Sequence, residues 1–177
     1  ISSAKEWERE TMKELLLSPA SRWSLLTGKM LATFVMNVPG TLLVLLVVIG
    51  FIGVHPVHWG EMIWVMALTL FIFVAFGMLL GTLLKRWQAV TALAIGSSIP
   101  LFFLSGAFGP ISFNTQAIQV LAKIFPVYYA IVLQQHAFHG FDLNTYGVGG
   151  NALILVVYAL ALLVLTTLFL RRSTLAH

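Results

Sequence analysis

The sequence has no cysteine and very little charge. Charged residues make up only 9% of the 177 residues, whereas about 25% is typical of a soluble domain. Without cysteine, the chain forms no disulfide and offers no thiolate to a metal ion. Hydrophobic residues instead account for 59% of the chain. This composition excludes an ordinary soluble enzyme and predicts a protein embedded in a membrane.

Four long apolar segments determine the predicted fold class. Each is close to the ~20 residues that a helix needs to cross the hydrocarbon core of a bilayer. Backbone polar groups find no water inside a bilayer, so such segments are helical. We therefore expect an all-α integral membrane protein, a helical bundle with spans at about residues 30–53, 62–84, 88–105 and 149–170.

The basic residues are distributed unevenly between the two sides that these spans define. Of the ten Lys and Arg residues, only Lys123 falls on one side. The others lie before the first span, between the second and third, or after the fourth: Lys5, Arg9, Lys13, Arg22, Lys29, Lys85, Arg86, Arg171 and Arg172. Short basic segments stay in the cytosol, so both ends of the sequence should be cytosolic and residues 107–148 outside a cell membrane. Basic residues at span ends anchor to lipid head groups, so the net charge of +4 does not indicate nucleic-acid binding.

A charged segment, residues 1–29, precedes the transmembrane domain, which we place at residues 30–177. Mixed charges at i,i+3 spacing favour a short helix over residues 1–17. Pro19 cannot continue that helix, but it suits the first turn of a second helix with Ser18 as N-cap. The second helix would pass Lys29 and enter the first span. The sequence thus predicts a helix–break–helix elbow at the cytosolic surface.

Glycine and proline add two features to the spans. Pro39-Gly40 predicts a kink in the first span. Gly77 and Gly81 have the spacing that lets two helices approach closely. This pair could form the seam of a dimer, but we favour packing between two helices of one chain.

The outer segment, residues 107–148, is too interrupted to be a clean fifth span. Residues 115–124 have an amphipathic pattern, Pro126 ends it, and residues 127–138 begin another apolar stretch. Neither stretch is long enough to cross a bilayer. We expect a re-entrant or interfacial pair of short helices.

The N-terminal segment carries an ordered set of short motifs. They are Glu6-Trp7-Glu8-Arg9, Thr11-Met12, Leu15-Leu16, Ser18-Pro19 and Gly28-Lys29, with weaker signals at Ser105-Gly106, Pro110 and Phe125-Pro126. This order resembles the ABC type-2 transporter permeases, over essentially the whole chain. Members of that family have six spans, so the four spans here would be the third to the sixth. Because the sequence opens on Ile1, we expect it to be the C-terminal part of a longer chain.

The resemblance implies a role and partners. The family's cytosolic motif docks on an ATP-binding subunit, and the corresponding coupling residues are Glu8, Arg9, Thr11, Met12, Leu15, Leu16 and Pro19. Glu10 stands where the family usually has Gly. The expected partners are that ATP-binding subunit, a second permease subunit as a homo- or heterodimer, and membrane lipids.

Gly28-Lys29 does not make an ATP site of its own. A phosphate-binding loop needs Gly five residues before its second Gly and Ser or Thr after the Lys, but Trp23 and Met30 occupy these positions. ATP hydrolysis is therefore expected from the partner, and no cofactor is expected on this chain. The predicted function is a permease subunit of an ABC exporter that translocates an amphipathic, drug-like or lipid-linked substrate by alternating access.

Two alternatives to this function stay open. His55, His58, His136 and His139, with Glu61 and Asp142 near them in sequence, could supply zinc ligands for an intramembrane metalloenzyme, although interfacial histidines are the simpler interpretation. The other alternative is a passive membrane anchor for a cytosolic partner. The charged elbow would then be only a solvated helix beside the membrane. Polar residues within the spans could line a substrate path, but such side chains more often bond their own helix: Asn37, Thr41, Ser97, Ser98, Asn151 and Tyr158.

Overall fold

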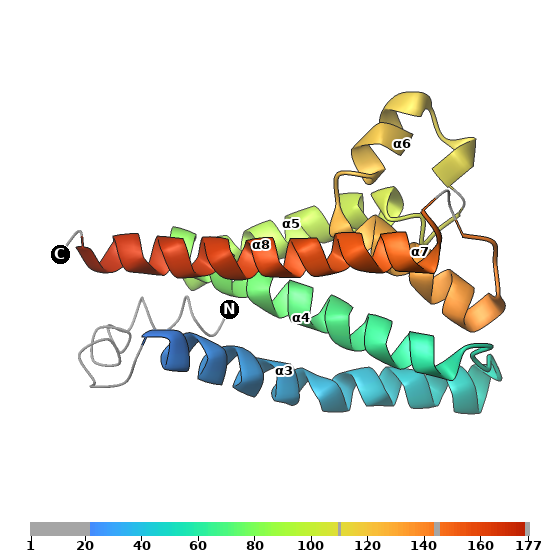
Figure 1. The fold of residues 1–177 in the computed structure, drawn as a ribbon, viewed down its shortest axis with the longest axis horizontal. Helices are drawn as coiled ribbons and strands as arrows, with labels where there is room; N and C mark the ends of the chain where they lie inside the picture. The colour runs from blue at the N-terminus through green and yellow to red at the C-terminus, as the bar shows by residue number, and fades with distance from the viewer. Residues whose placement is uncertain (1–21, 110, 144–145, 176–177) are drawn as a thin grey trace.

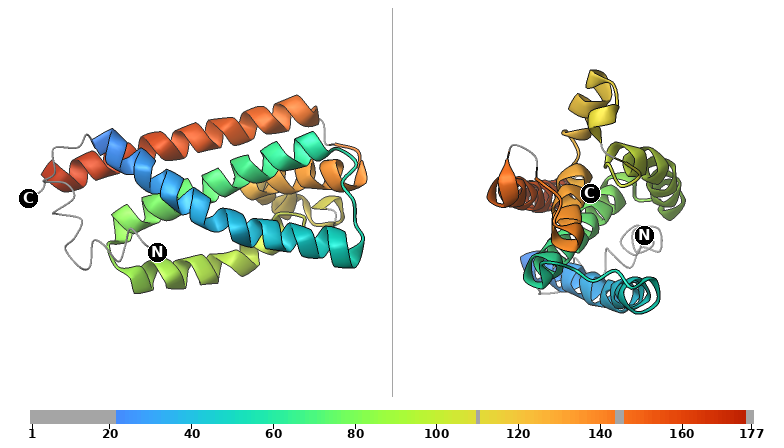
Figure 2. Two further views of the ribbon diagram at one scale, coloured as in Figure 1. Left: turned by 90° about the horizontal axis from the view of Figure 1, so that it is seen from below. Right: turned by 90° about the vertical axis from the view of Figure 1, so that its right-hand side faces the viewer.

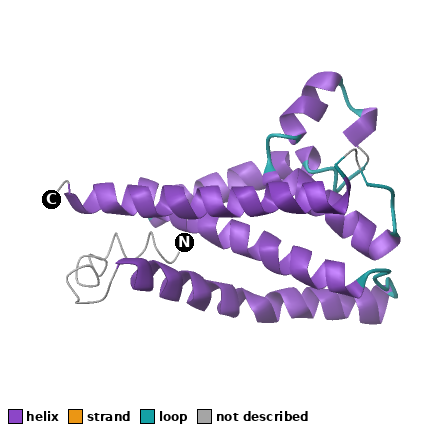
Figure 3. Ribbon diagram, in the orientation of Figure 1, coloured by secondary structure: helices purple, strands orange, loops and turns teal. Residues whose placement is uncertain are grey.

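The computed structural model describes residues 22–109, 111–143 and 146–175, and these residues are almost entirely helical. The described part contains no strand (Figure 3). In chain order the helices are α3 Arg22–Val47, which continues as the π-helix Val48–Ile52, α4 Trp59–Leu84, α5 Trp87–Leu104, the 3-10 turn Ile111–Phe113, α6 Gln116–Ala122, α7 Pro126–His139 and α8 Gly147–Leu175. The expected elbow, with its coupling residues from Glu8 to Pro19, lies outside the described residues.

Four of these helices are long and apolar enough to cross a membrane, which confirms the predicted fold class. The qualifying stretches are Thr27–Ile52, Trp59–Leu84, Trp87–Leu104 and Gly147–Phe169. Arg22 and Lys29 lie inside α3, so the helix that enters the first span includes these two basic residues. The α3–α4 loop, α6, α7 and the start of α8 lie together at one end of the bundle, here called the distal end (Figure 1). The start of α3, the α4–α5 connection and the end of α8 lie at the other, proximal end.

Helix α4 is the centre of the bundle because it contacts α3, α5, α7 and α8. Its distal half packs with α7 and α8 around one buried cluster: Val65, Ile72, Tyr129, Ala130, Leu133, Leu155 and Ala159. Its proximal half packs on α3 around a second cluster: Met30, Val74, Ala75 and Met78. The side chains that carry the tight packing are therefore those of α4, α7 and α8.

Helices α3 and α5 lie at the edges of the bundle (Figure 2). Both expose apolar side chains. Met36 on α3 and Phe51 on the π-helix that continues it are 84% and 83% exposed, and only Val90 is buried on α5. An apolar surface of this extent needs lipid or another protein to cover it. It agrees with a membrane-embedded chain whose outer helices face lipid or a neighbouring subunit.

The first span remains helical through Pro39. Three side chains around it donate to carbonyls one turn back: Thr33 Oγ1 to Lys29, Asn37 Nδ2 to Thr33 and Thr41 Oγ1 to Asn37, at 2.9, 2.8 and 3.1 Å. Side chains of this kind satisfy backbone groups in a helix that proline interrupts. In the left view of Figure 2, α3 changes direction part-way along its length.

Candidate functional site: the α6–α7 pair and its pocket

Helices α6 and α7 form a bent pair between the end of α5 and the start of α8. Their axes differ by 91° across a break of a few residues. Phe125, with φ −99° and ψ 136°, is extended, and Pro126 follows at the first turn of α7, where its missing N–H costs nothing. The predicted division into two short helices near Pro126 is thus confirmed. Both α5 and α8 meet the pair at the distal end (Figure 1), so the chain enters and leaves on the same side, as a re-entrant element does.

Two tyrosines hold the turn between α6 and α7. The phenol of Tyr129 donates to the carbonyl of Lys123 at 2.8 Å, and the phenol of Tyr158 in α8 donates to the carbonyl of Ile124. The last carbonyls of a helix have no partner within the helix. The two phenols supply hydrogen-bond donors to the carbonyls at the end of α6. Tyr158 lies about 16 Å along α8 from Gly147, at 1.5 Å per residue. The turn is therefore anchored to α8 about three helical turns from that helix's start.

The far end of α7 is joined to the start of α4 by three contacts. Glu61 Oε2 lies 3.0 Å from His136 Nδ1, and the backbone N–H of His58 donates to the carbonyl of Ala137 at 2.9 Å. The rings of His58 and His136 also stack, with centroids 5.0 Å apart. Glu61 is in the first turn of α4, where a carboxylate is favoured by the helix dipole. Its other oxygen, Oε1, is buried and has no partner among the described residues.

The histidines considered as metal ligands are only partly brought together. His58 and His136 stack, whereas His139 stacks on Phe141 at 5.1 Å and His55 is exposed. Within the described ranges, no group of three or more His, Cys, Asp or Glu side chains is arranged to hold a metal ion. The geometry of His58, Glu61 and His136 therefore supports a joint between α4 and α7.

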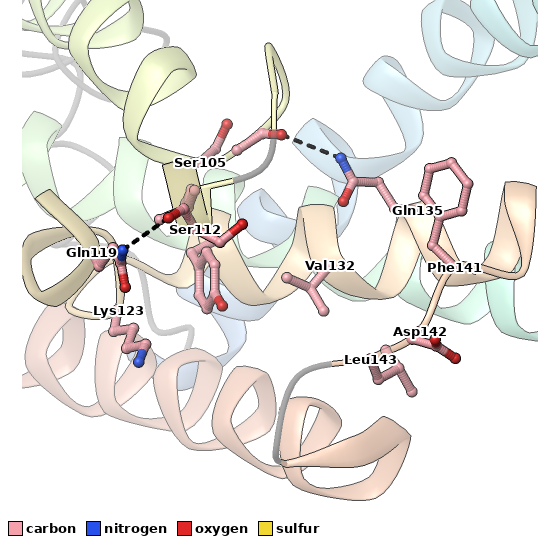
Figure 4. Close-up of a pocket in the computed structure, with 12 residues that line it drawn as sticks. Ser105, Ser112, Gln119, Lys123, Val132, Gln135, Phe141, Asp142 and Leu143 are labelled. Atoms are coloured by element: carbon pink, nitrogen blue, oxygen red, sulfur yellow. Dashed lines mark hydrogen bonds between the residues drawn. The ribbon is translucent and has the colours of Figure 1, made fainter. Parts of the chain in front are cut away.

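A pocket of about 300 Å³ opens beside the α6–α7 pair (Figure 4). Its walls come from the end of α5 and the 3-10 turn, from α6, from α7 and from the loop after α7: Ser105, Gly106, Ile111, Ser112, Gln119, Lys123, Tyr128, Val132, Gln135, Phe141, Asp142 and Leu143. Two amide side chains brace the walls. Gln135 Nε2 donates to the carbonyl of Gly106 at 3.2 Å, and Gln119 Nε2 donates to the carbonyl of Asn114 at 2.9 Å.

Ser105 and Gly106 form the corner at which α5 ends. The Ser105 hydroxyl donates to the carbonyl of Phe102 at 2.6 Å and accepts the N–H of Ala107 at 3.2 Å. Gly106 has φ +82°, and a Cβ there would lie 3.1 Å from Cγ1 of Ile111. Both the conformation and the space favour glycine. The Ser-Gly motif that the sequence singled out is therefore a wall of the pocket.

The sequence did not predict the pocket, although part of its signal was present. Tyr128, Val132 and Gln135 have the i, i+4, i+7 spacing of one helix face, and all three line it. What the sequence could not indicate is that this face meets the corner at Gly106.

The polar residues in the spans mostly bond their own helix, as expected. Thr41, Ser97 and Ser98 donate to carbonyls three or four residues back, and Asn151, fully buried, donates to the carbonyl of Gly147 at 2.6 Å. Tyr158 is the exception, because it bonds the α6–α7 turn. In α4, Gly81 is buried, and a Cβ on Gly77 would meet no atom within 4 Å. The helix-packing role of this glycine pair stays a prediction.

Comparison with known proteins gives one family and a few relatives. Residues 2–168 match the family described as ABC-2 family transporter protein. The chain is 28% identical, over 170 residues, to the probable multidrug ABC transporter permease YbhS of Escherichia coli strain K12, and equally to that of strain O157:H7. The alignment covers 94% of this chain and 43% of each relative, so the chain spans less than half the length of the curated proteins it matches. No solved structure matches at a significant level.

Proposed function

Because the chain belongs to the ABC-2 transporter family, we propose that it forms part of the membrane-spanning permease subunit of an ATP-driven exporter. The observation that carries the proposal is the family match over residues 2–168 on a chain with four helices able to cross a membrane. ATP is hydrolysed by a separate ATP-binding subunit on the cytosolic side. Two permease subunits pair around the path, which is why α3 and α5 can present bare apolar surface.

The substrate is an amphipathic, drug-like or lipid-linked molecule. The related proteins of E. coli carry the name probable multidrug permease, which supports this class. The spans are rich in apolar residues, and the polar side chains within them mostly bond their own helix. Surfaces of this kind suit an apolar or amphipathic molecule better than an ion. An ion at membrane depth would need charged or polar side chains to compensate its charge.

Coupling starts at the residues that the family resemblance assigns to docking, among them Glu8, Arg9 and Met12. They precede α3, which runs without interruption from Arg22 to Val47. A displacement at the start of α3 reaches α4 through Met30, which is 4% exposed and packs against Val74 and Met78. A continuous helix transmits such a push without the loss expected of a flexible loop.

The same displacement can reach the distal end through α4. Glu61 at the start of α4 is bonded to His136 of α7, and the shared cluster around Val65 and Leu133 joins α4, α7 and α8. Alternating access then requires two arrangements of this bundle whose balance is shifted by the ATP-binding subunits. The orientation implied by the basic residues puts α6 and α7 at the outer mouth of the path.

The coupling assignment is tested by the double variant Glu8→Ala/Arg9→Ala. Truncating one member of a desolvated, hydrogen-bonded charge pair costs on the order of 2–5 kcal/mol, so the variant should lose most of its capture of the ATP-binding subunit and most of its transport. Insertion into the membrane should be unaffected. Pull-down and substrate efflux are measured at matched expression.

A matched control for that experiment is Glu10→Gly. It restores the residue usual in the family and should keep both pull-down and transport, although glycine costs about 1 kcal/mol inside a helix. If the double variant pulls down the ATP-binding subunit and transports like the wild type, the docking role is wrong and a passive anchor becomes the better explanation.

A further inference from the structure

The pocket beside the α6–α7 pair holds one positive and one negative side chain at opposite ends (Figure 4). Lys123 comes from the end of α6, and Asp142 from the loop after α7; Val132 lies between them in the picture. Among the residues that the structure describes, they are the only charged ones that line the pocket. Both are exposed, and no ion pair within the described ranges joins them. A molecule with separated positive and negative groups is complementary to this arrangement.

The wall near Lys123 also offers hydroxyl groups. Ser112 and Tyr128 line the pocket, and no hydrogen bond of either hydroxyl occurs among the described residues. A hydroxyl can donate one hydrogen bond and an ammonium three. A phosphate beside Lys123 therefore finds several donors, while the carboxylate of Asp142 accepts hydrogen bonds from an ammonium group.

The depth of the pocket matches the head-group layer of a membrane. Helix α5 has 18 residues, Trp87–Leu104, and is about 27 Å long at 1.5 Å per residue. The hydrocarbon core of a bilayer is about 30 Å thick. Ser105 and Gly106 follow directly and line the pocket, so this wall of the pocket lies where hydrocarbon gives way to head groups.

Exposed aromatic residues lie close in the sequence to the pocket residues Ser105 and Gly106. Phe102 and Phe103 end α5 next to Ser105, and Phe108 lies just after Gly106; they are 50%, 54% and 77% exposed. The rings of Phe103 and Phe108 are 5.6 Å apart. Apolar side chains left bare beside a charged pocket suit a ligand whose polar head carries hydrocarbon tails.

We propose that this pocket binds the head group of a phospholipid that carries a phosphate and a primary ammonium, as phosphatidylethanolamine does. The phosphate lies at Lys123, the ammonium at Asp142, and the acyl chains run along the exposed face of α5. A soluble phosphoethanolamine carries the same phosphate and ammonium groups, but the aromatic surface at Phe102, Phe103 and Phe108 favours the lipid. The site goes beyond the proposed transport function, because it is a lipid-binding site whatever the permease carries.

The test measures lipids bound to the purified, delipidated permease by native mass spectrometry. Phosphatidylethanolamine, phosphatidylcholine and phosphatidylglycerol are added separately at equal concentration. Wild-type protein should retain phosphatidylethanolamine best, because the choline group cannot donate hydrogen bonds to Asp142 and the glycerol head group lacks a cation. Soluble glycerophosphoethanolamine is added as a competitor, and it should displace the lipid poorly.

Two variants locate the site. Lys123→Gln should lower the affinity for phosphatidylethanolamine about fivefold, because one basic residue at a membrane surface contributes about 1 kcal/mol. Lys123→Arg should restore the affinity. Asp142→Asn should abolish the preference over phosphatidylglycerol, because it removes repulsion of the anionic lipid. Arg86→Gln, which changes an exposed basic residue at the proximal end, is the matched control and should bind like the wild type.

Three results would overturn the proposal. One is equal retention of all three lipids by the wild type. Another is unchanged phosphatidylethanolamine binding by Lys123→Gln. The third is displacement of the lipid by soluble glycerophosphoethanolamine at matched concentration, which would assign the pocket to a soluble ligand. None of these bears on ATPase capture, so the proposed function is tested separately.

Discussion

The phenol of Tyr158, in the middle of α8, donates a hydrogen bond to the carbonyl of Ile124, 34 residues earlier in the chain. Ile124 lies in the turn where α6 gives way to α7, so this bond fixes the turn of the bent pair to a spanning helix. Ile124 lies beyond the end of α6, where backbone carbonyls have no partner within the helix, and Tyr158 supplies the donor. The tyrosine thereby couples the position of the α6–α7 pair to that of α8.

Removing this phenol should loosen the turn. Tyr158→Phe keeps the ring but deletes the donor, and should lower the free energy of unfolding by about 1 kcal/mol, the usual net value of one hydrogen bond. Amide hydrogen exchange should rise around Phe125 and leave the proximal half of α4 unchanged. Tyr128→Phe is the matched control, because no hydrogen bond of the Tyr128 hydroxyl occurs among the described residues. Equal exchange in wild type and Tyr158→Phe would show that the bond does not hold the turn.

The joint between α4 and α7 depends on Glu61 and His136, which are 3.0 Å apart and whose side chains are 11% and 21% exposed. Glu61→Ala and His136→Ala should each lower the free energy of unfolding by about 1–3 kcal/mol, because each leaves a largely buried polar group without its partner. The double variant should cost less than the sum by at least about 0.5 kcal/mol. Unfolding is followed in detergent by titration with sodium dodecyl sulfate.

His55→Ala is the control for that cycle. His55 is exposed, and substitutions at such positions usually change stability by no more than about 0.5 kcal/mol. Strict additivity of Glu61→Ala and His136→Ala would mean that the two side chains do not stabilise each other.

The corner at Gly106 should tolerate no side chain. Gly106→Ala places a Cβ 3.1 Å from Ile111 in a residue with φ +82°, and strain of this kind costs on the order of 1–3 kcal/mol. We expect a lower melting temperature and weaker binding of phosphatidylethanolamine. Gly96→Ala in α5 is the matched control, since a Cβ there meets no atom within 4 Å and alanine favours a helix. It should be neutral or stabilising; a Gly106→Ala protein as stable as the wild type would refute the strain argument.

The orientation in the membrane can be tested by cysteine labelling, because the chain has no cysteine of its own. Asn114→Cys, at the distal end, should react with a membrane-impermeant maleimide added outside intact cells. Arg86→Cys, in the α4–α5 connection, should react only after the cytosolic side is opened. Labelling of Asn114→Cys from the cytosolic side alone would invert the topology predicted by the basic residues.

Much of the fold followed from the sequence because it depends on local chemistry. Apolar runs of membrane length become helices whatever surrounds them, and Pro126 cannot continue α6, so the break between α6 and α7 was predictable. The side-chain bonds of Thr41, Ser97 and Ser98 were also predictable, because their partners are one turn away. The continuity of the first span with the helix before it was also predicted, since α3 includes Arg22 and Lys29. The ends of the helices were less predictable: the second span was expected from residue 62, while α4 begins at Trp59.

The candidate site depended on contacts between distant segments. Glu61 and His136 are 75 residues apart, and Gln135 bonds Gly106 across 29 residues. The sequence predicted histidine pairs from their i,i+3 spacing, but in the structure His58 stacks on His136, from another helix, and His139 stacks on Phe141. Which faces of α4, α7 and α8 meet is decided by how their side chains interlock. Spacing along one helix records which residues share a face, but it contains no information about the element packed against that face. The sequence alone therefore determined the number of spanning helices, the site of the break and the predicted orientation, whereas only the tertiary structure decided which residues form the α4–α7 joint and the charged pocket.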